Sequence, residues 1–216
     1  MKDLIIVGAS GFGREVAWLV ERINQRRLTW NLLGFIDDDR EKQGKEINGY
    51  PVLGTVEEAG KYADANFVCA IGASKIRKSV VEAIRAVQPS AAFATLIDPS
   101  AEISDFVNIG EGSIICAQNI ITVNVEIGNH VIINLDCTIG HDAILQDFVT
   151  VYPNVNISGA AKIGTGVELG TGTQIIQGKE IGEGSIIGAG AVVVKDIPAN
   201  CTAVGIPAKA IKYFEA

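Results

Sequence analysis

The chain carries two different hydrophobic patterns, one in its first 93 residues and another in the rest. From Ile97 onward an Ile, Leu or Val recurs at every sixth position, without interruption, as far as Val193. The position two before each of these anchors is mostly small or β-branched, as at Ala101, Val107 and Ala143. Because side chains alternate between the two faces of a strand, both positions point to the same side. The repeat therefore predicts short strands that bury one face and turn a corner every six residues.

Three such strands make one triangular coil of 18 residues, and a stack of coils is a parallel β-helix. The residues between the strands include many glycines and asparagines, which suit tight corners. The six-residue step does not reveal the handedness of the coil. It does not identify a chemistry either, because stacked coils can serve as an enzyme or as a passive scaffold.

Residues 1–93 lack the six-residue step and alternate between apolar runs and amphipathic stretches. The pattern predicts strands at 4–7, 32–37 and 66–71, and helices at 12–25, 56–62 and 75–87. This alternation is typical of a small α/β domain with a parallel, Rossmann-like sheet. In the last helix we expect Lys75, Arg77 and Lys78 to form a solvated face. The predicted domains are residues 1–93, a β-helix over 94–198 and a C-terminal tail over 199–216.

Candidate ligand-binding residues follow the predicted strands of the first domain. The sequence Gly8-Ala9-Ser10-Gly11-Phe12-Gly13 connects the first strand to the first helix, with a GxxGxG spacing that departs from the GxGxxG dinucleotide signature. Three aspartates, Asp37 to Asp39, end the second strand, and Gly72 follows the third. Open α/β sheets bind ligands at the carboxyl ends of their strands, where a carboxylate can accept hydrogen bonds from a ribose or a base. The alternatives are a tight glycine turn and a solvated acidic turn without a ligand.

The two histidines, His130 and His141, both fall at predicted corners of the coil and are expected to face outward. Asp142 follows His141 directly, and a carboxylate beside an imidazole can orient it. Gly159 lies 18 residues later at the same corner, about 5 Å away, and leaves space for a reactive carbonyl. A backbone N–H there could stabilise the developing oxyanion. A corner histidine can also be a plain surface residue, so His141 is a candidate general base.

The composition of the chain narrows the classes of function that it can have. Basic residues number 18 and acidic residues 25, which gives a net charge of −7 and argues against a general nucleic-acid binder. No apolar run approaches the length of a membrane span. The four cysteines form no CxxC pair and the N-terminus does not resemble a signal peptide, so we expect reduced thiols in a cytoplasmic protein. The separated histidines and cysteines predict no metal site.

Several segments resemble a known enzyme group. They are GASGFGREVA, FIDDD and AIGASKIRK in the first domain, INLDCTIGHDAILQDFVTVYP at 133–153, and VGIPAKAIK near the end. Over essentially its whole length the chain resembles the hexapeptide-repeat sugar acetyltransferases of the bacillosamine and perosamine N-acetyltransferase and sialic acid O-acetyltransferase-like group. The resemblance implies a left-handed β-helix, acetyl-CoA as co-substrate without a metal, and a homotrimer with CoA in the cleft between adjacent β-helices.

The resemblance also implies residue roles. His141 matches the general base, Asp142 the acidic residue that orients it, and Gly159 the glycine whose amide meets the thioester carbonyl. The other positions that match CoA-binding residues are Gly170, Thr171, Ala189, Pro207 and Lys209. The positions that match the sugar-nucleotide pocket are Ser10, Gly11, Phe12, Asp37, Asp38 and Gly72, and Asn134 matches a polar neighbour of the base.

The chain departs from the group at two positions. Many relatives have histidine in place of Phe12, and several have a second histidine in place of Thr150. The implied activity is acetyl transfer from acetyl-CoA to the amine of a nucleotide-linked amino sugar, by direct attack. Two alternatives stay open, which are O-acetylation of a sugar such as a sialic acid and a non-catalytic scaffold that binds a nucleotide.

Overall fold

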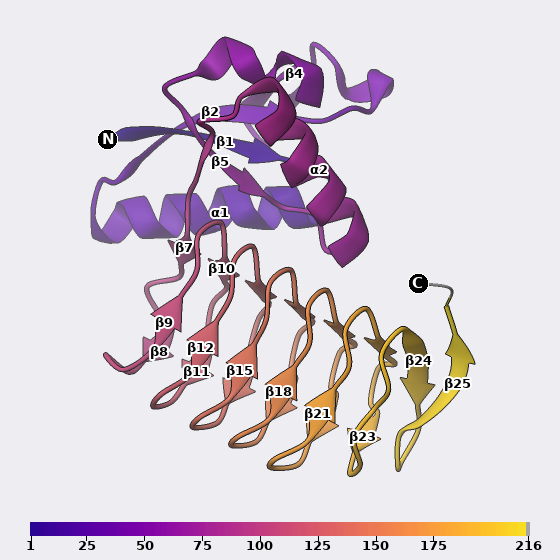
Figure 1. The fold of residues 1–216 in the computed structure, drawn as a ribbon. Helices are drawn as coiled ribbons and strands as arrows, with labels where there is room; N and C mark the ends of the chain where they lie inside the picture. The colour runs from indigo at the N-terminus through magenta and orange to yellow at the C-terminus, as the bar shows by residue number, and fades with distance from the viewer. Residues whose placement is uncertain (215–216) are drawn as a thin grey trace. The chain divides into compact units, whose positions relative to one another are not determined.

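The computed structural model describes residues 1–214, so Glu215 and Ala216 of the expected tail lie outside the described part. The chain divides into two compact units, the first over Met1–Pro99 and the second from Ser100 onward (Figure 1). The first is an α/β unit and the second a parallel β-helix, which confirms the predicted fold class. No helix within residues 1–214 has the length and hydrophobicity that a membrane crossing requires.

The first unit is built on a sheet with the strand order β3-β4-β2-β1-β5-β6. All its pairs are parallel except β3 with β4. The strands are β1 (Lys2–Val7), β2 (Trp30–Ile36), β3 (Glu46–Ile47), β4 (Tyr50–Gly54), β5 (Asn66–Cys69) and β6 (Ala92–Phe93). The helices are α1 (Gly11–Arg26), α2 (Ser74–Val87) and the 3₁₀ segments η1 (Arg40–Lys42) and η2 (Val56–Tyr62), and the unit ends after β7 (Leu96–Ile97).

The core of the first unit lies around β1, whose residues Leu4 to Val7 are fully buried. A central parallel strand is covered on both faces, so it reads as a continuous apolar run. The hairpin of β3 and β4 was not among the predicted elements. Its two-residue loop is Asn48-Gly49, with φ of 49° and 83°, a pair typical of tight hairpins.

Arg77 corrects one expectation about α2. Lys75 and Lys78 are exposed as expected, but Arg77 is completely buried. Its Nη1 donates hydrogen bonds to the carbonyl oxygens of Ile71, at 2.6 Å, and Gly72, at 3.0 Å. A buried guanidinium needs such acceptors because it has left water. Arg77 therefore anchors the segment that follows β5 and is not part of a solvated face.

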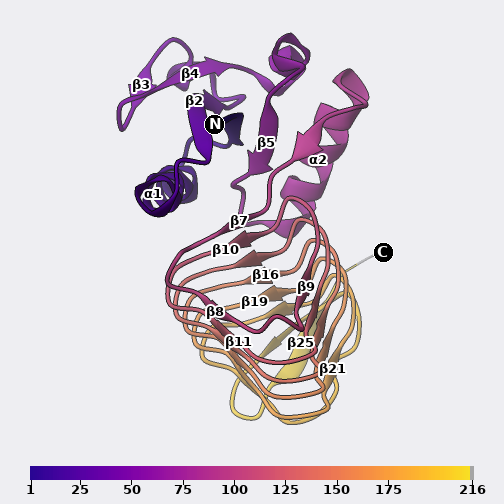
Figure 2. The same cartoon turned by 90° about the vertical axis from the view of Figure 1, so that its left-hand side faces the viewer.

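The second unit consists of short strands on three sides of a coil, as the view along the coil in Figure 2 shows. The first side contains β10 (Ile114–Ile115), β13 (Ile132–Ile133), β16 (Thr150–Val151), β19 (Glu168–Leu169), β22 (Ile186–Ile187), β24 (Cys201–Val204) and β25 (Lys209–Tyr213). The second side contains β8 (Glu102–Ile103), β11 (Ile120–Ile121), β14 (Thr138–Ile139), β17 (Asn156–Ile157), β20 (Gln174–Ile175) and β23 (Val192–Val193). The third side contains β9 (Asn108–Ile109), β12 (Glu126–Ile127), β15 (Ile144–Leu145), β18 (Lys162–Ile163) and β21 (Glu180–Ile181).

The register of these strands confirms the predicted coil of 18 residues. Ile114 pairs with Ile132, and Thr138 with Asn156, each 18 residues further along and in parallel. Every six-residue anchor from Ile115 to Val193 is buried in one continuous core. Buried polar side chains inside the coil bond to the corners, as when Asn119 donates to the Cys116 carbonyl and accepts from the Cys137 amide. The repeat thus buries its apolar side chains and also provides hydrogen-bond partners for backbone groups at the corners.

Contrary to the expectation from the sequence, His130 does not face solvent. Its side chain is 1% exposed and stacks on Phe148, with ring centroids 5.0 Å apart. On the coil before it, a Cβ on Gly112 would lie 2.3 Å from His130 Nδ1. The residues one coil before and one coil after therefore enclose the imidazole, and His130 is a packed corner residue.

Candidate functional site

A cavity of about 250 Å³ opens at the carboxyl ends of β1 and β2 in the first unit. Three of the residues expected to bind the sugar nucleotide line this cavity, namely Ser10, Asp37 and Asp38. The others, Gly11, Phe12 and Gly72, are not among its lining residues. Lys42 also lines this cavity, although the sequence pattern did not indicate it. The sequence carries only a weak signal for Lys42, because this residue lies in the short 3₁₀ segment η1, which has no periodic hydrophobic pattern.

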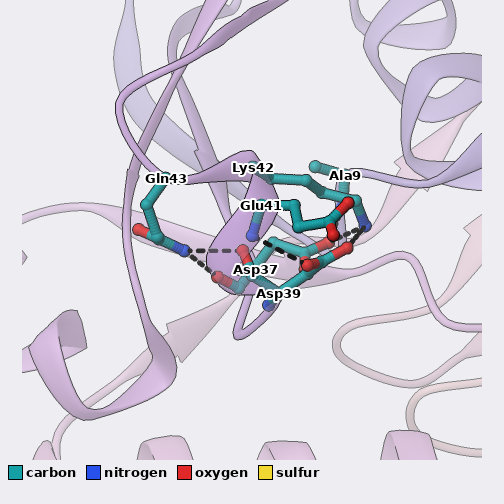
Figure 3. Close-up of polar contacts among 6 residues, drawn as sticks. All are labelled: Ala9, Asp37, Asp39, Glu41, Lys42 and Gln43. Carbon is teal, nitrogen blue, oxygen red and sulfur yellow. Dashed lines mark hydrogen bonds and ion pairs between the residues drawn. The ribbon is translucent and has the colours of Figure 1, made fainter.

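Asp37 connects the glycine loop to η1 (Figure 3). Its Oδ2 accepts hydrogen bonds from the Ala9 amide at 2.7 Å and from Lys42 Nζ at 2.9 Å, and its Oδ1 accepts one from the Asp39 amide at 2.9 Å. Burial alone would raise the pKa of Asp37, but these three hydrogen bonds and the Lys42 charge together lower it. Most of the acceptor capacity of Asp37 is therefore used inside the chain, and its carboxylate shapes the cavity wall.

Asp38 and Ser10 offer the cavity more open polar groups. Asp38 is exposed, and its Oδ1 accepts a hydrogen bond from the Val56 amide at 2.8 Å. Ser10 stands at the N-cap position of α1, but its side chain makes no capping hydrogen bond. An Asp38 oxygen and the Ser10 hydroxyl can thus contact a polar ligand.

Two glycines of the loop, Gly8 and Gly13, serve close packing. Gly8 has a φ of +99°, which side chains rarely adopt. A Cβ on Gly13 would lie 1.9 Å from the Gly8 carbonyl oxygen. The GxxGxG spacing therefore lets α1 start directly against the end of β1, which places Ser10 at the cavity.

The second group of expected residues lies at the corner between β14 and β15. His141 is 65% exposed at its side chain, and its Nδ1 lies 2.8 Å from Asp142 Oδ2. A Cβ on Gly159, one coil further on, would lie 2.5 Å from His141 Nε2. The hydrogen bond to His141 is the largest cause that lowers the pKa of Asp142, followed by one from Asn124. The structure thus brings an accessible imidazole, a carboxylate and the side-chain-free backbone of Gly159 together at one corner.

The remaining expected residues lie at a different corner. Gly170 and Thr171 follow β19, and a Cβ on Gly170 would lie 2.6 Å from the Ala189 amide nitrogen, so the three positions are neighbours. Asn134 also lies between the first and second sides, after β13, and its Oδ1 accepts from the Leu135 amide at 2.8 Å.

Pro207 lies in the connection from β24 to β25, and Lys209 is the first residue of β25. The Ala208 amide between them donates to the Val192 carbonyl in β23 at 2.8 Å. The corner with Gly170 joins the first and second sides, whereas the corner with His141 joins the second and third. One chain does not gather these residues at a single point.

The cysteines offer no nucleophile at the His141 corner. All four are buried, and burial raises the pKa of the Cys69 thiol to about 12 and that of the Cys137 thiol to about 11. Thiols with such pKa values are protonated at neutral pH and unreactive. Within residues 1–214 no group of three or more His, Cys, Asp or Glu side chains could hold a metal ion.

Comparisons with known proteins match both units. Residues 3–84 match the family model described as the PglD N-terminal domain. The UDP-N-acetylbacillosamine N-acetyltransferase of Bacillus subtilis is 36% identical over 120 residues, which are 54% of this chain and 52% of that protein. The match thus spans about half the length of this curated relative.

Solved structures match over nearly the whole chain. A mutant of perosamine N-acetyltransferase from Caulobacter crescentus, in complex with CoA and GDP-perosamine, superposes with a TM-score of 0.90 and 27% identity, covering 98% of this chain and 97% of that one. The acetyltransferase domain of PglB from Neisseria gonorrhoeae has a TM-score of 0.86 and 31% identity, covering 98% of this chain and all of its own. The same domain in complex with acetyl coenzyme A has a TM-score of 0.87 and 32% identity, covering 97% and 99%. With its fold and motifs also in agreement, the chain belongs to the bacillosamine- and perosamine-type sugar acetyltransferase family.

Proposed function

We propose that the protein is an acetyl-CoA-dependent N-acetyltransferase that acts on the amine of a nucleotide-linked amino sugar. The observation that carries this proposal is the corner at which the His141 imidazole, the Asp142 carboxylate and the Gly159 backbone meet. The matched structures agree, since one contains CoA with GDP-perosamine and another acetyl coenzyme A. Residues 1–93 would bind the sugar nucleotide, 94–198 would carry the transfer, and the tail at 199–216 would border CoA.

In the proposed reaction the sugar amine attacks the acetyl carbonyl carbon of acetyl-CoA directly. His141 accepts the amine proton at Nε2, because Nδ1 faces Asp142. The Gly159 N–H makes no hydrogen bond within residues 1–214 and would donate to the oxyanion. The carbon–sulfur bond then breaks, and the thiolate of CoA leaves and takes up a proton. No acyl-enzyme forms, in keeping with the buried, protonated Cys137 thiol.

The two separate corners support a homotrimer. Gly170, Thr171, Ala189, Pro207 and Lys209 would line the pantetheine arm and the nucleotide of CoA at one corner, whereas His141 stands at another. We propose that a cofactor in contact with both corners lies between two copies of the chain, as in the homotrimer that the resemblance implies. Asn134 would reach the imidazole in the same way, from the neighbouring copy.

The cavity of the first unit would hold the nucleoside of the acceptor. Asp37, Asp38 and Asp39 outnumber the single cation Lys42 among its lining residues, so the neutral ribose and base suit this end better than a diphosphate. The diphosphate would lie toward Ser10 at the start of α1, together with Gly11 and Phe12, where amide N–H groups favour anions. Gly72 would contribute backbone at the same edge of the sheet.

An acetyl-transfer assay tests the proposal. The protein is mixed with acetyl-CoA and a panel of UDP-, GDP- and TDP-linked amino sugars, and the release of free thiol is followed. We expect release with an amino-sugar nucleotide, and a 100- to 10,000-fold lower kcat for His141→Ala, the range typical of general-base catalysis. Release with free sialic acid alone would indicate O-acetylation, and no release with any acceptor would indicate a scaffold. A loss below threefold for His141→Ala would exclude it as the base.

A further inference from the structure

Asn124 occupies the same corner as Asp142, one coil earlier. Its Nδ2 donates to Asp142 Oδ1 at 3.3 Å, while the other oxygen of that carboxylate, Oδ2, lies 2.8 Å from His141 Nδ1. The Asp142 amide also donates to the Val123 carbonyl at 3.1 Å, which fixes the two coils against each other. The three side chains therefore form a linear chain, in which each carboxylate oxygen has its own partner.

We propose that Asn124 is a positioning residue for catalysis, which holds the Asp142 carboxylate in the orientation that aligns the His141 imidazole. This inference rests on the proposed function, since it concerns the same base.

A positioning residue is needed here because the His141 and Asp142 side chains are exposed to solvent. The side chains of His141 and Asp142 are 65% and 56% exposed, so packing does not fix their rotamers. A carboxylate held by one hydrogen bond alone can turn toward water, and the imidazole then loses the partner that keeps its proton on Nδ1. The second hydrogen bond from Asn124 opposes that rotation. Nε2 then stays unprotonated and directed at the space beside Gly159.

Few other charges face this imidazole. The adjacent coils bring Val123 and Asn124 on one side, and Gly159 and Ala160 on the other, to the same corner, and none of them is charged. Along this corner Asp105 lies two coils before His141, and Lys179 lies one residue more than two coils beyond Asp142. At two strand spacings, roughly 10 Å, water and salt screen both. Asp142 is thus the charged group in contact with the imidazole.

Asn124 also has a conformational role, which the experiment must separate. Its φ is 57°, and asparagine tolerates this left-handed conformation better than most residues. Asn124→Gly keeps the turn but removes the amide, and Asn124→Asp keeps both the size and the turn but replaces the donor by a negative charge. A matched control is Asn108→Ala, which removes an amide-to-carboxylate bond of 2.8 Å between two coils, from Asn108 to Glu126 on the third side.

The test is steady-state kinetics with acetyl-CoA and the preferred amino-sugar nucleotide. We expect Asn124→Gly to lower kcat about fivefold, the equivalent of one hydrogen bond, with both KM values and the melting temperature unchanged. Asn124→Asp should also shift the acidic limb of the kcat/KM profile to higher pH, because the added charge stabilises the imidazolium. Asn108→Ala should keep the wild-type kcat.

A double-mutant cycle decides whether Asn124 acts through Asp142. In an Asp142→Gly background, which keeps the positive φ of residue 142, Asn124→Gly should cause no further loss of kcat, because the acceptor side chain is gone. Full activity of Asn124→Gly, or an additive loss in the cycle, would overturn the proposal. A fully active His141→Ala would instead overturn the proposed mechanism, so the two failures are distinguishable.

Discussion

The imidazole of His141 lies directly against the bare backbone of Gly159, because a Cβ at position 159 would come within 2.5 Å of Nε2. Gly159→Ala should therefore displace the imidazole and fill the space expected for the acetyl carbonyl. We expect kcat to fall at least tenfold while the coil stays folded, since a displacement of about 1 Å at a reacting group costs up to 100-fold.

Circular dichroism and kcat measured together check this prediction. A suitable control is Gly60→Ala, because a Cβ there would make only an ordinary contact of 3.5 Å. Wild-type turnover in Gly159→Ala would show that this space is not used in the reaction.

The β-helix could be predicted from the sequence almost residue by residue, and the reason is physical. A buried anchor at every sixth position, from Ile115 to Val193, allows only one register, and the pairing of Ile114 with Ile132 follows from it. His141 and Gly159 are 18 residues apart, so their proximity at one corner is a consequence of the same repeat.

The parts that could not be predicted depend on individual side chains rather than on a period. Arg77 has lysines two residues before and one residue after it, which suggested a solvated face, yet its guanidinium bonds to the Ile71 and Gly72 carbonyls. His130 lies at a corner like His141, but Phe148 covers it. Whether a corner side chain is open depends on the size of its neighbours one coil away, which the six-residue anchors do not encode.

Arg77→Met should destabilise the first unit. The substitution removes the hydrogen bonds that the buried guanidinium donates to the Ile71 and Gly72 carbonyl oxygens, and a hydrogen bond from a charged group contributes about 1.5–3 kcal/mol to the free energy of unfolding. Ile71 also lines the cavity, so the KM for the sugar nucleotide should rise while the KM for acetyl-CoA stays constant. Chemical denaturation and kinetics measure both, with the exposed Lys78→Met as control. Equal stability of the two variants would contradict the role of Arg77.

Asp37 makes the stability of the first unit dependent on pH. Its folded pKa lies below the ordinary value, so the carboxylate stabilises the fold above about pH 4. This contribution is lost as the pH falls through the folded pKa. Asp37→Asn should therefore lower the melting temperature at pH 7, and its difference from the wild type should shrink toward pH 3. Thermal melts across this range check the sign, with the exposed Asp64→Asn as the control substitution.

Cys137 provides a test of direct transfer against an acyl-enzyme. Its thiol is fully buried, donates to the carbonyl oxygens of Leu135 and Tyr152, and has a pKa raised to about 11 by burial. A group protonated at neutral pH and closed off from solvent cannot attack acetyl-CoA. Cys137→Ala should therefore keep kcat within about twofold, with a modest loss of stability from the small cavity. Mass spectrometry after incubation with acetyl-CoA alone should find no acetylated cysteine, and a stable acetyl adduct on Cys137 would replace the direct mechanism by a two-step one.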